Sequence, residues 1–526
     1  MPDTGDSAVV VPTARQKYRF RMGGPQSLKE ALQVFPDLAL SDMRGAHLFK
    51  DLLRTIKEGV HVHSDFSGLD MFMMVNHTLS GALKNAGEDV GIGVHHIYGC
   101  DNWPWATAVL QKYPEPPKYL FRDVCERWPA SVVHQLSLAC DEVGGDHGLA
   151  KHQKGEMLVQ KMAAILQKAV DDGVELAAIC MLSGAEVKFS DFNKDELAAL
   201  KCAIAGLQCL EFSTYGTQTF LGGKTTLTLM CWLFERKLMQ EDFICIEQVE
   251  AFKPYMVVIM RYLPEYDMHS VLLSPSMFGF PAQRRRVYFC LTLKSKITFD
   301  LGGKTFAEAF HMFERDVALD GDAIFCAPDE DVAAHQAQSK RKRSAAEALS
   351  ENPLDAEIGI PHARRLECFI RAEEMKRDTA KKKNLTKQDS ASSAASSQEE
   401  EGRAVVHADH ARIVCIEQTE FKGRPSVLMP CLLCRSAVYS YRMKRIAIPM
   451  EHFITQGLTV YESLESPNSR CPLRQYLASL PPTVQKRLAG NTMHKLCAGI
   501  FWVRVLSMIR KRPSDMSEIC IGEDSE

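Results

Sequence analysis

Between residues 59 and 300, short apolar runs that end in glycine or an acidic residue alternate with stretches of helical spacing. The clearest of these runs are HVHSDFSG (61–68), HHIYGCD (95–101), CAIAGLQC (202–209), DFICIEQV (242–249) and RVYFCLTL (286–293). Alternation of this kind predicts βαβ units and a mostly parallel sheet, that is, an α/β fold of the Rossmann type. Ligands of such sheets sit beyond the carboxyl ends of the strands. We therefore expect functional side chains directly after the runs.

The segments outside these runs have other patterns. Residues 27–58 have helical spacing, interrupted at Pro36, and predict an N-terminal helical extension. Residues 154–173 place Met and aliphatic side chains near one helical face, which is typical of a packing helix. Residues 327–404 are rich in Ser, Ala, Lys and Glu, so we expect them to be largely disordered or helical only in patches. Apolar periodicity returns at 410–512.

Composition narrows the class of protein. The 526 residues are 46% hydrophobic with a net charge of −3, so any nucleic-acid surface must be local. No long uncharged apolar run and no secretory pattern occur, so neither a membrane span nor a signal peptide is expected. Seventeen scattered cysteines suit a reducing cytosolic or nuclear compartment. The basic cluster SKRKR (339–343) is interpreted as a nuclear localisation signal, with a phosphate-contacting arm or a solvated linker as alternatives.

Three chemically active groups follow strand-like runs. Cys209 lies in a loop after the run that reaches Gly206, and Glu247 ends the run FICIE. A glutamate that ends an apolar strand costs burial energy unless it serves a partner. Arginines 284–286 directly precede another strand, and alternation puts Arg284 and Arg286 on one face. A thiol, a carboxylate and two guanidinium groups are thus expected at one edge of the sheet.

The order of these elements resembles the motif series of the DNA (cytosine-5) methyltransferase family. Cys209 falls where the Pro-Cys-Gln loop of that family carries its nucleophile, and CLEFS matches its following Phe-Ser. Glu247-Gln-Val is similar to Glu-Asn-Val, and GFPAQRRRVY resembles Gly-Val-Pro-Gln-x-Arg-x-Arg-Val, which aligns Arg284 and Arg286. RIAIPMEHFITQGL (445–458) and RLAGNTMHKLCAG (487–499) are similar to the last two motifs, and the second of these contains Asn491.

The resemblance also implies a site for S-adenosylmethionine. HSDFSGLDM (63–71) resembles the first Phe-x-Gly-x-Gly motif, with Phe66 against an adenine and Gly68 in the turn. Asp101 ends another apolar run, where a carboxylate accepts both ribose hydroxyls in nucleotide-binding βαβ units. Asp123 matches the acid that binds the adenine amino group, with a helix N-cap as its alternative role. Asn491 belongs to the motif that packs back beside the cofactor.

The resemblance implies an arrangement of regions along the chain. A helical extension (1–58) precedes a catalytic S-adenosylmethionine-binding core (59–299) that has an insertion at about 130–195. A smaller, irregular target-recognition region (300–440) contains the linker at 327–404. Residues 441–512 return to the core, and an acidic tail (513–526) follows.

The implied reaction is methylation of C5 of cytosine in duplex DNA, with the base flipped into the pocket. Cys209 adds to C6, and Glu247 contacts N3 and the exocyclic amine. Arg286 orients Glu247 and the base. Methylation of tRNA is an alternative, although the Cys-Phe-Thr signature of that branch is absent. Departures from the family pattern at positions 64, 70, 208, 210, 248 and 282 motivate another alternative, a catalytically silent binding protein that keeps the fold.

Two further motifs are set aside. LGGKTT (221–226) looks like a phosphate loop, but Gln218 stands where that loop requires glycine, so nucleotide hydrolysis is rejected. Cys431 and Cys434 have zinc-ligand spacing without a second pair nearby. We interpret them as buried strand cysteines and predict no metal site.

Overall fold

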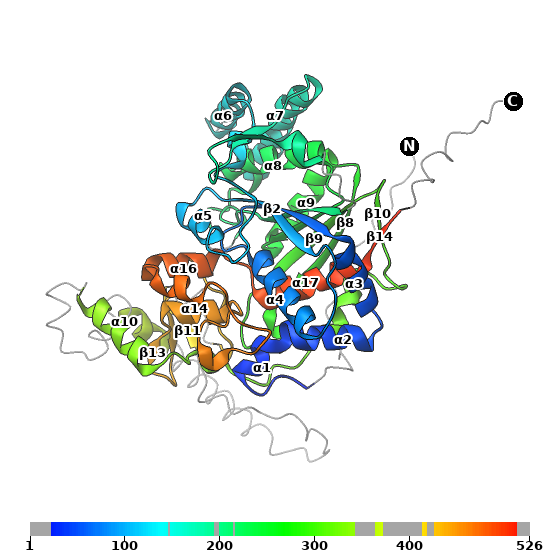
Figure 1. The fold of residues 1–526 in the computed structure, drawn as a ribbon. Coiled ribbons are helices and arrows are strands. Elements are labelled where there is room, and N and C mark those ends of the chain that lie inside the picture. The colour runs from blue at the N-terminus through cyan, green and yellow to red at the C-terminus, as the bar shows by residue number, and fades with distance from the viewer. Residues whose placement is uncertain are drawn as a thin grey trace, which may run out of the picture.

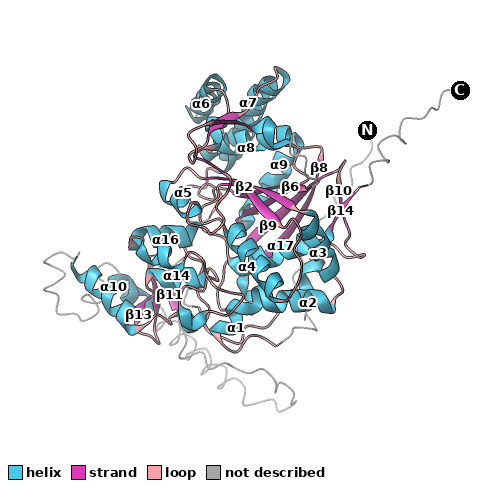
Figure 2. Cartoon of the chain, in the orientation of Figure 1, coloured by secondary structure: helices cyan, strands magenta, loops and turns pink. Residues whose placement is uncertain are grey.

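The computed structural model describes residues 23–145, 148–193, 199–213, 216–341, 363–371, 413–417 and 426–512. A seven-stranded sheet lies at its centre, in the order β3-β2-β1-β6-β7-β9-β8. Its strands are β1 (Val60–Asp65), β2 (Val94–Cys100), β3 (Tyr119–Phe121), β6 (Leu200–Gly206), β7 (Phe243–Gln248), β8 (Tyr266–Leu273) and β9 (Arg286–Leu293). β3, β2, β1, β6 and β7 run parallel, whereas β9 is antiparallel to β7 and β8. The predicted mostly parallel sheet is confirmed (Figure 2).

Alternation along the strands sends side chains into two separate cores. In β7, Phe243 and Cys245 join the core on one face, and Ile244 and Ile246 join the core on the other. The first face is covered by α3 (Phe49–Glu58), α4 (Met71–Asn85) and α17 (Lys495–Met508), and the second by α6 (Ala130–Gly145), α7 (Lys151–Asp171), α8 (Thr225–Met239) and α9 (Lys253–Ile259). A sheet buried on both faces accounts for the nearly continuous apolar runs of the sequence.

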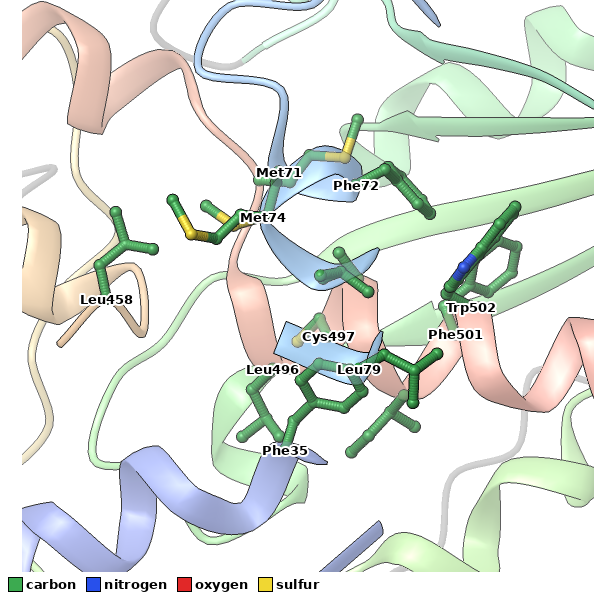
Figure 3. Close-up of a cluster of buried hydrophobic side chains, with 14 of the residues drawn as sticks. Phe35, Met71, Phe72, Met74, Leu79, Leu458, Leu496, Cys497, Phe501 and Trp502 are labelled. Carbon is green, nitrogen blue, oxygen red and sulfur yellow. The ribbon is translucent and has the colours of Figure 1, made fainter. Parts of the chain in front are cut away.

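The two ends of the described chain meet on the first face. α17 lies beside α3 and α4, although more than 400 positions separate it from them (Figure 1). Figure 3 shows their contact, where the rings of Phe72 and Trp502 pack edge to face at 5.4 Å. α17 also contacts Phe35, which precedes α3 in the chain. A Cβ at Gly499 would lie 2.5 Å from the Phe35 ring, so glycine is required where α17 meets this ring. The C-terminal segment thus completes the core that holds the N-terminal helices.

The N-terminal helices and the insertion flank the sheet. α1 (Leu28–Gln33), a π-helical turn (Val34–Leu38) and α2 (Ala39–Gly45) precede α3. Between β3 and β6, α6 and α7 are followed by the antiparallel hairpin β4 (Ala177–Ile179) and β5 (Glu186–Lys188). α7 contains most of the stretch expected as a packing helix, and it buries Leu158, Met162 and Leu166. Its buried face packs against α8.

A smaller unit follows the sheet. Strands β11 (Ile413–Cys415), β12 (Val438–Ser440) and β13 (Arg445–Ile446) form an antiparallel sheet, and a helix at 363–371 shares its core. Nearby lie α10 (Asp329–Arg341), α14 (Pro449–Thr455), α15 (Arg474–Ser479) and α16 (Pro482–Asn491). Parts of the stretch expected to be largely disordered are therefore helical, at 329–341 and 363–371. Arg343 and the lysines at 376–383 lie outside the described residues, as do the side chains of 339–341.

Short elements complete the description. β10 (Ile297–Phe299) pairs with β14 (Ile509–Lys511), and α5 (Pro104–Leu110) follows β2. The 3-10 turns are η2 (Val124–Arg127), η3 (Phe189–Asn193), η4 (Phe220–Gly222), η5 (Glu250–Phe252), η6 (Met260–Tyr262), η7 (Pro275–Met277), η8 (Glu308–Phe313), η9 (Gly321–Ile324) and η10 (Glu462–Leu464). Within the described ranges, no helix combines the length and apolarity needed to cross a bilayer.

Candidate active site

The register of the central strands places the candidate chemistry at one edge of the sheet. Glu247 is paired with Gly206 of β6 on one side and with Tyr288 of β9 on the other. Cys209 comes three positions after Gly206, and Arg286 is the first residue of β9, which runs in the opposite direction. The carboxyl ends of β6 and β7 and the amino end of β9 therefore meet at the same edge, as expected for a ligand site of such a sheet.

One cavity of about 1450 Å³ opens at this edge. The nine residues that the sequence singled out all line it: Phe66, Gly68, Asp101, Asp123, Cys209, Glu247, Arg284, Arg286 and Asn491. They come from seven segments of the chain, which lie at or shortly after the ends of β1, β2, β3, β6 and β7, at the start of β9 and at the end of α16. Its opposite wall is built from residues 430–435 and 487–493 of the smaller unit and the returning segment.

Glu247 and Arg286 form an ion pair inside this cavity. Arg286 Nε lies 3.2 Å from Glu247 Oε1, and both side chains are at most 14% exposed. Arg286 also donates to the carbonyl of Arg285 at 2.8 Å, which fixes the direction of its guanidinium group. Burial favours the neutral guanidine, but the neighbouring Cys431, Glu247 and Cys209 outweigh it and raise the pKa of Arg286. The guanidinium therefore stays charged beside the carboxylate.

Cys209 lies at the start of a tightly folded loop. Its carbonyl accepts hydrogen bonds from the N–H groups of Phe212 (3.1 Å) and Ser213 (2.9 Å). Gln248 Nε2 donates to the carbonyls of Leu207 (3.2 Å) and Gln208 (3.1 Å) and ties the loop to the end of β7. Burial raises the pKa of the Cys209 thiol, although Arg286 and Arg284 act in the opposite direction. Gln248, which departs from the family pattern, is thus a loop-holding residue that the sequence did not identify.

The other two arginines face different ways. Arg284 is buried, and it donates to the carbonyls of Thr492 (2.7 Å), Leu432 (3.4 Å) and Gly490 (3.4 Å). Its guanidinium group thereby binds the returning segment to the sheet. Arg285 is exposed and pairs with Glu250, with Nε 3.0 Å from Oε2. The predicted alternation of the three arginines is visible in these contacts.

Our interpretation of Cys431 and Cys434 as buried strand cysteines is wrong. Both lie outside strands, are half-buried and line the cavity. The sulfur of Cys431 accepts contacts from Arg286 Nη2 (3.6 Å) and Arg284 Nη1 (3.7 Å). Burial alone would raise the pKa of the Cys431 thiol, but the two arginines outweigh it and lower the pKa. The spacing of the pair was visible in the sequence, but its proximity to the arginines depends on the chain returning across the sheet.

The cofactor half of the cavity is formed by the ends of β1 and β2. Phe66 (φ 53°) and Gly68 (φ 54°) both adopt left-handed backbone conformations in the turn after β1. Asp101 accepts from the N–H groups of Gly68 (2.7 Å) and Trp103 (2.9 Å), which orient its carboxylate. Burial raises the pKa of Asp101, and those two hydrogen bonds oppose that shift. Each Asp101 oxygen retains a further acceptor position for a ligand hydroxyl.

Asp123 and Asn491 complete this part of the lining. Asp123 caps η2 by accepting from Cys125 N at 2.9 Å, so the alternative N-cap role is present together with its place at the cavity. Asn491 Oδ1 accepts from Cys434 Sγ at 2.7 Å. A Cβ at Gly490 would lie 2.6 Å from Cys434 N, so glycine permits this close approach of residues 487–493 to residues 430–435. Asn491 therefore contacts the segment that carries the cysteines, within the same wall of the cavity.

A buried ionic network supports the floor of the cofactor half. Arg127 donates to Asp65 Oδ1 (2.6 Å) and Glu235 Oε1 (2.7 Å), and Arg236 pairs with Glu235 and Glu241. None of these side chains is exposed. Burial would raise the pKa of Asp65, but Arg127 and Arg236 outweigh it and lower the pKa. The strand that precedes Phe66 is therefore held by the ion pairs of Asp65 with Arg127 and Arg236.

Comparison with known proteins gives matches of fold only. No protein-family model matches the chain, and no curated protein matches it in sequence. An E. coli prophage protein described as a DNA modification methyltransferase is 13% identical, with 85% of this chain and 98% of that chain covered and a TM-score of 0.39. The Entamoeba histolytica methyltransferase EhMeth is 11% identical, with 85% and 98% covered and a TM-score of 0.37. The S. pombe Dnmt2 methyltransferase is 12% identical, with 85% and 98% covered and a TM-score of 0.33.

All three of these proteins are described as methyltransferases. The order of the seven strands and the antiparallel β9 match the sheet of S-adenosylmethionine-dependent methyltransferases. The chain therefore has an S-adenosylmethionine-dependent methyltransferase fold.

Proposed function

We propose that the protein transfers a methyl group from S-adenosylmethionine to C5 of cytosine in DNA through a covalent adduct with Cys209. The observation that carries this proposal is that Cys209, Glu247 and Arg286 share one cavity with Phe66, Asp101 and Asp123. A thiol, a carboxylate and a guanidinium group thus line the same cavity as the residues expected to bind a nucleoside. The cavity volume of about 1450 Å³ leaves room for both a nucleoside cofactor and a flipped base.

The residues of the cofactor half suit S-adenosylmethionine. Asp101 and Asp123 line it, and their carboxylates can accept hydrogen bonds from the hydroxyl and amino groups of a nucleoside. Asp101 would hold the ribose hydroxyls, Asp123 the adenine amino group and Phe66 the adenine face. A Cβ at Gly68 would meet nothing within 4 Å, so the turn there borders open space. When bound, the cofactor supplies an electrophilic methyl group.

The residues of the target half suit an addition and elimination on cytosine. Cys209 Sγ, as thiolate, forms a bond to C6, and the C5–C6 electron pair becomes available at C5. Glu247 holds N3 and the exocyclic amine, and Arg286 fixes Glu247 by their ion pair. After C5 has gained the methyl group, a base removes the C5 proton. That electron pair restores the C5–C6 bond and expels Cys209.

The test is methyl transfer from tritium-labelled S-adenosylmethionine to duplex DNA of mixed sequence. Replacing Cys209 by Ala should lower the rate by roughly 10³-fold or more, the size expected when a nucleophile is lost. Cys140→Ala is the matched control, because Cys140 is a half-buried cysteine on α6 that does not line the cavity. DNA that carries 5-fluorocytosine cannot lose its C5 substituent as a proton, so it should trap a covalent adduct that maps to Cys209.

The remaining outcomes separate the rival functions. Equal incorporation by Cys209→Ala and the native protein would overturn the nucleophile. Incorporation into tRNA with none into DNA would replace DNA as the substrate. A folded protein that neither binds S-adenosylmethionine in calorimetric titration nor methylates either nucleic acid would be a silent binding module. The long segment at 300–440 supports DNA, because a short recognition region is typical of the tRNA-modifying branch.

A further inference from the structure

The segment that looks like a phosphate loop holds a carboxylate of this chain. α8 begins at Thr225, directly after LGGK, and the preceding Lys224 provides no side-chain cap. Glu211, in the loop that follows Cys209, provides the side-chain cap of α8 instead. Its Oε1 accepts from Thr225 N at 3.2 Å, and its Oε2 accepts from Thr225 Oγ1. The first turn of α8 therefore binds the carboxylate of Glu211.

The local sequence is shaped around this carboxylate. A Cβ at Gly223 would overlap the carboxyl group of Glu211, so glycine is required at that position. Glu211 is only 6% exposed, and a buried carboxylate is tolerated where N–H and hydroxyl donors meet it. The N-terminal end of a helix adds a favourable field for a negative charge. The glycine-rich segment thus forms a seat for Glu211.

This seat lies two residues from the candidate nucleophile. The carbonyl of Glu211 accepts from Phe220 N at 3.1 Å, and the carbonyl of Leu210 accepts from Thr217 N at 3.1 Å. Both hydrogen bonds fold the loop back toward α8. Since Cys209 directly precedes this pair of residues, its position depends on where Glu211 is anchored.

The insertion supports the other side of the seat. A Cβ at Gly155 of α7 would lie 3.1 Å from Leu221, which shows how closely α7 approaches η4. Lys151 Nζ donates to the carbonyl of Gln218 at 3.2 Å. α7, which belongs to the insertion at about 130–195, therefore packs directly against the loop that follows Cys209.

We propose that Glu211 is a positioning residue that, through its seat on the first turn of α8, fixes the Cys209 loop beside Glu247 and Arg286. The part about catalysis rests on the proposed function, since Cys209 is the nucleophile there. The anchoring of the loop stands on the contacts of Glu211 and is measured separately. α7 stabilises the same loop from below.

Release of Glu211 has a defined consequence for Cys209. In the anchored loop, burial raises the pKa of the Cys209 thiol. A freed loop exposes Cys209 to water, so the pKa of the thiol falls toward that of an exposed cysteine. A fall of one unit gives roughly tenfold more thiolate at neutral pH. Alkylation of Cys209 should therefore become faster, while a reaction that needs Cys209 beside Glu247 should become slower.

The experiment measures alkylation of Cys209 by iodoacetamide in the full chain, with each cysteine followed by mass spectrometry. Glu211→Ala should raise the rate at Cys209 roughly tenfold at pH 7.5 and move its pH midpoint downward. Glu211→Gln keeps an acceptor for Thr225 and should fall between Ala and the native protein. Gly223→Ala displaces the carboxylate and should resemble Glu211→Ala. In methyl transfer, Glu211→Ala should lower kcat and leave the Kd for S-adenosylmethionine unchanged.

Matched controls separate anchoring from general unfolding. Gly222→Ala changes the neighbouring glycine, where a Cβ would lie 3.4 Å from its nearest atom, and should stay within roughly twofold of the native rate. Cys245 is buried in β7 and should remain unlabelled as long as the sheet is intact. If Glu211→Ala also exposes Cys245, the variant has unfolded, and Thr225→Val tests the anchoring of the loop in its place. Thr225→Val removes only the Oγ1 donor, so it should raise the labelling of Cys209 alone.

An unchanged rate and pH midpoint at Cys209 in Glu211→Ala, with Cys245 protected, would overturn the proposal. If Glu211→Ala does not fold, an unchanged rate of Cys209 alkylation in Thr225→Val would also overturn the proposal. A native protein without methyl transfer, combined with faster alkylation in Glu211→Ala, would refute the proposed function and leave the anchoring role intact.

Discussion

Arg284 donates a hydrogen bond of 2.7 Å to the carbonyl of Thr492, a residue 208 positions later in the chain. This bond joins the segment that leads into β9 to the segment that carries Asn491. Arg286, two positions later, instead pairs with Glu247. Two arginines of one motif therefore have different tasks: the first binds the two walls of the cavity together, and the second orients the carboxylate.

Replacing Arg284 by Met should lower the free energy of unfolding by roughly 2–5 kcal/mol, because the carbonyls of Leu432 and Thr492, in buried contacts, and of Gly490, in a part-buried one, lose a charged donor. Arg286→Met should cost less stability. It breaks the ion pair with Glu247 and the contacts with the Arg285 carbonyl and Cys431 Sγ, but the Glu247 side chain is 10% exposed and lines the cavity, so water can hydrate its carboxylate. Both variants should lose methyl transfer. Urea unfolding followed by circular dichroism measures the difference. Equal stability of the two variants would contradict the assignment of different tasks.

Two of the half-buried cysteines that line the cavity, Cys209 and Cys431, should differ in reactivity. Arg284 and Arg286 lower the pKa of Cys431, whereas burial raises the pKa of Cys209. Labelling with iodoacetamide over a range of pH should therefore have a lower midpoint at Cys431 than at Cys209. Arg286→Met should raise the midpoint at Cys431. A lower midpoint at Cys209 in the native protein would be incompatible with this arrangement of charges.

Asp70 should make stability depend on pH. Burial raises its pKa to about 6, and its Oδ2 has no hydrogen-bond partner, although Oδ1 caps α4 by accepting from Met73 N. A carboxyl whose folded pKa is raised favours folding below its unfolded pKa, and that contribution is lost as the pH rises through about 6.

Asp70→Asn keeps the cap and removes the charge. It should therefore stabilise the protein by roughly 2–3 kcal/mol at pH 7.5 and by much less at pH 4. Thermal unfolding at the two pH values measures this. A stabilisation that is the same at both would show that Asp70 does not titrate in this range.

The ionic network below the cofactor half should be essential for folding. Arg127→Met leaves Asp65 and Glu235 without their shared partner and should cost roughly 3–5 kcal/mol. Arg122→Met is the control, because Arg122 is 65% exposed and solvent screens its pair with Glu126, so the loss of this pair should change stability little. Chemical denaturation of both variants provides the comparison. A small loss for Arg127→Met would mean that the network relaxes without cost.

The basic cluster SKRKR is proposed to direct nuclear import. Neutralising Lys340, Arg341, Lys342 and Arg343 together in a fluorescent fusion should then retain the protein in the cytoplasm. If the cluster contacts phosphates, the same variant should reduce the salt dependence of DNA binding without changing base preference. An unchanged salt dependence with cytoplasmic retention favours import alone.

The sequence by itself determined the elements and the candidate chemistry. Short, nearly continuous apolar runs with helical spacing between them predict a parallel sheet with both faces covered, because a strand buried on both faces carries apolar side chains on both sides. The resemblance to known motifs added the individual residues, from Phe66 to Asn491, and all of them line one cavity. Local pattern was sufficient for this because strand ends and turns are set by nearby residues.

Only the tertiary structure determined which residues the candidate side chains contact. Cys431 looked like an ordinary core cysteine until the chain brought it against two arginines from 145 positions or more away. Glu211 and Gln248 hold the Cys209 loop through contacts that no spacing in the sequence reveals. LGGKTT resembles an anion-binding loop, but only the folded chain shows that the anion is a carboxylate of its own. Side-chain pairing and pKa depend on burial and on neighbours distant in sequence, and those are fixed only when the sheet and the returning segment pack together.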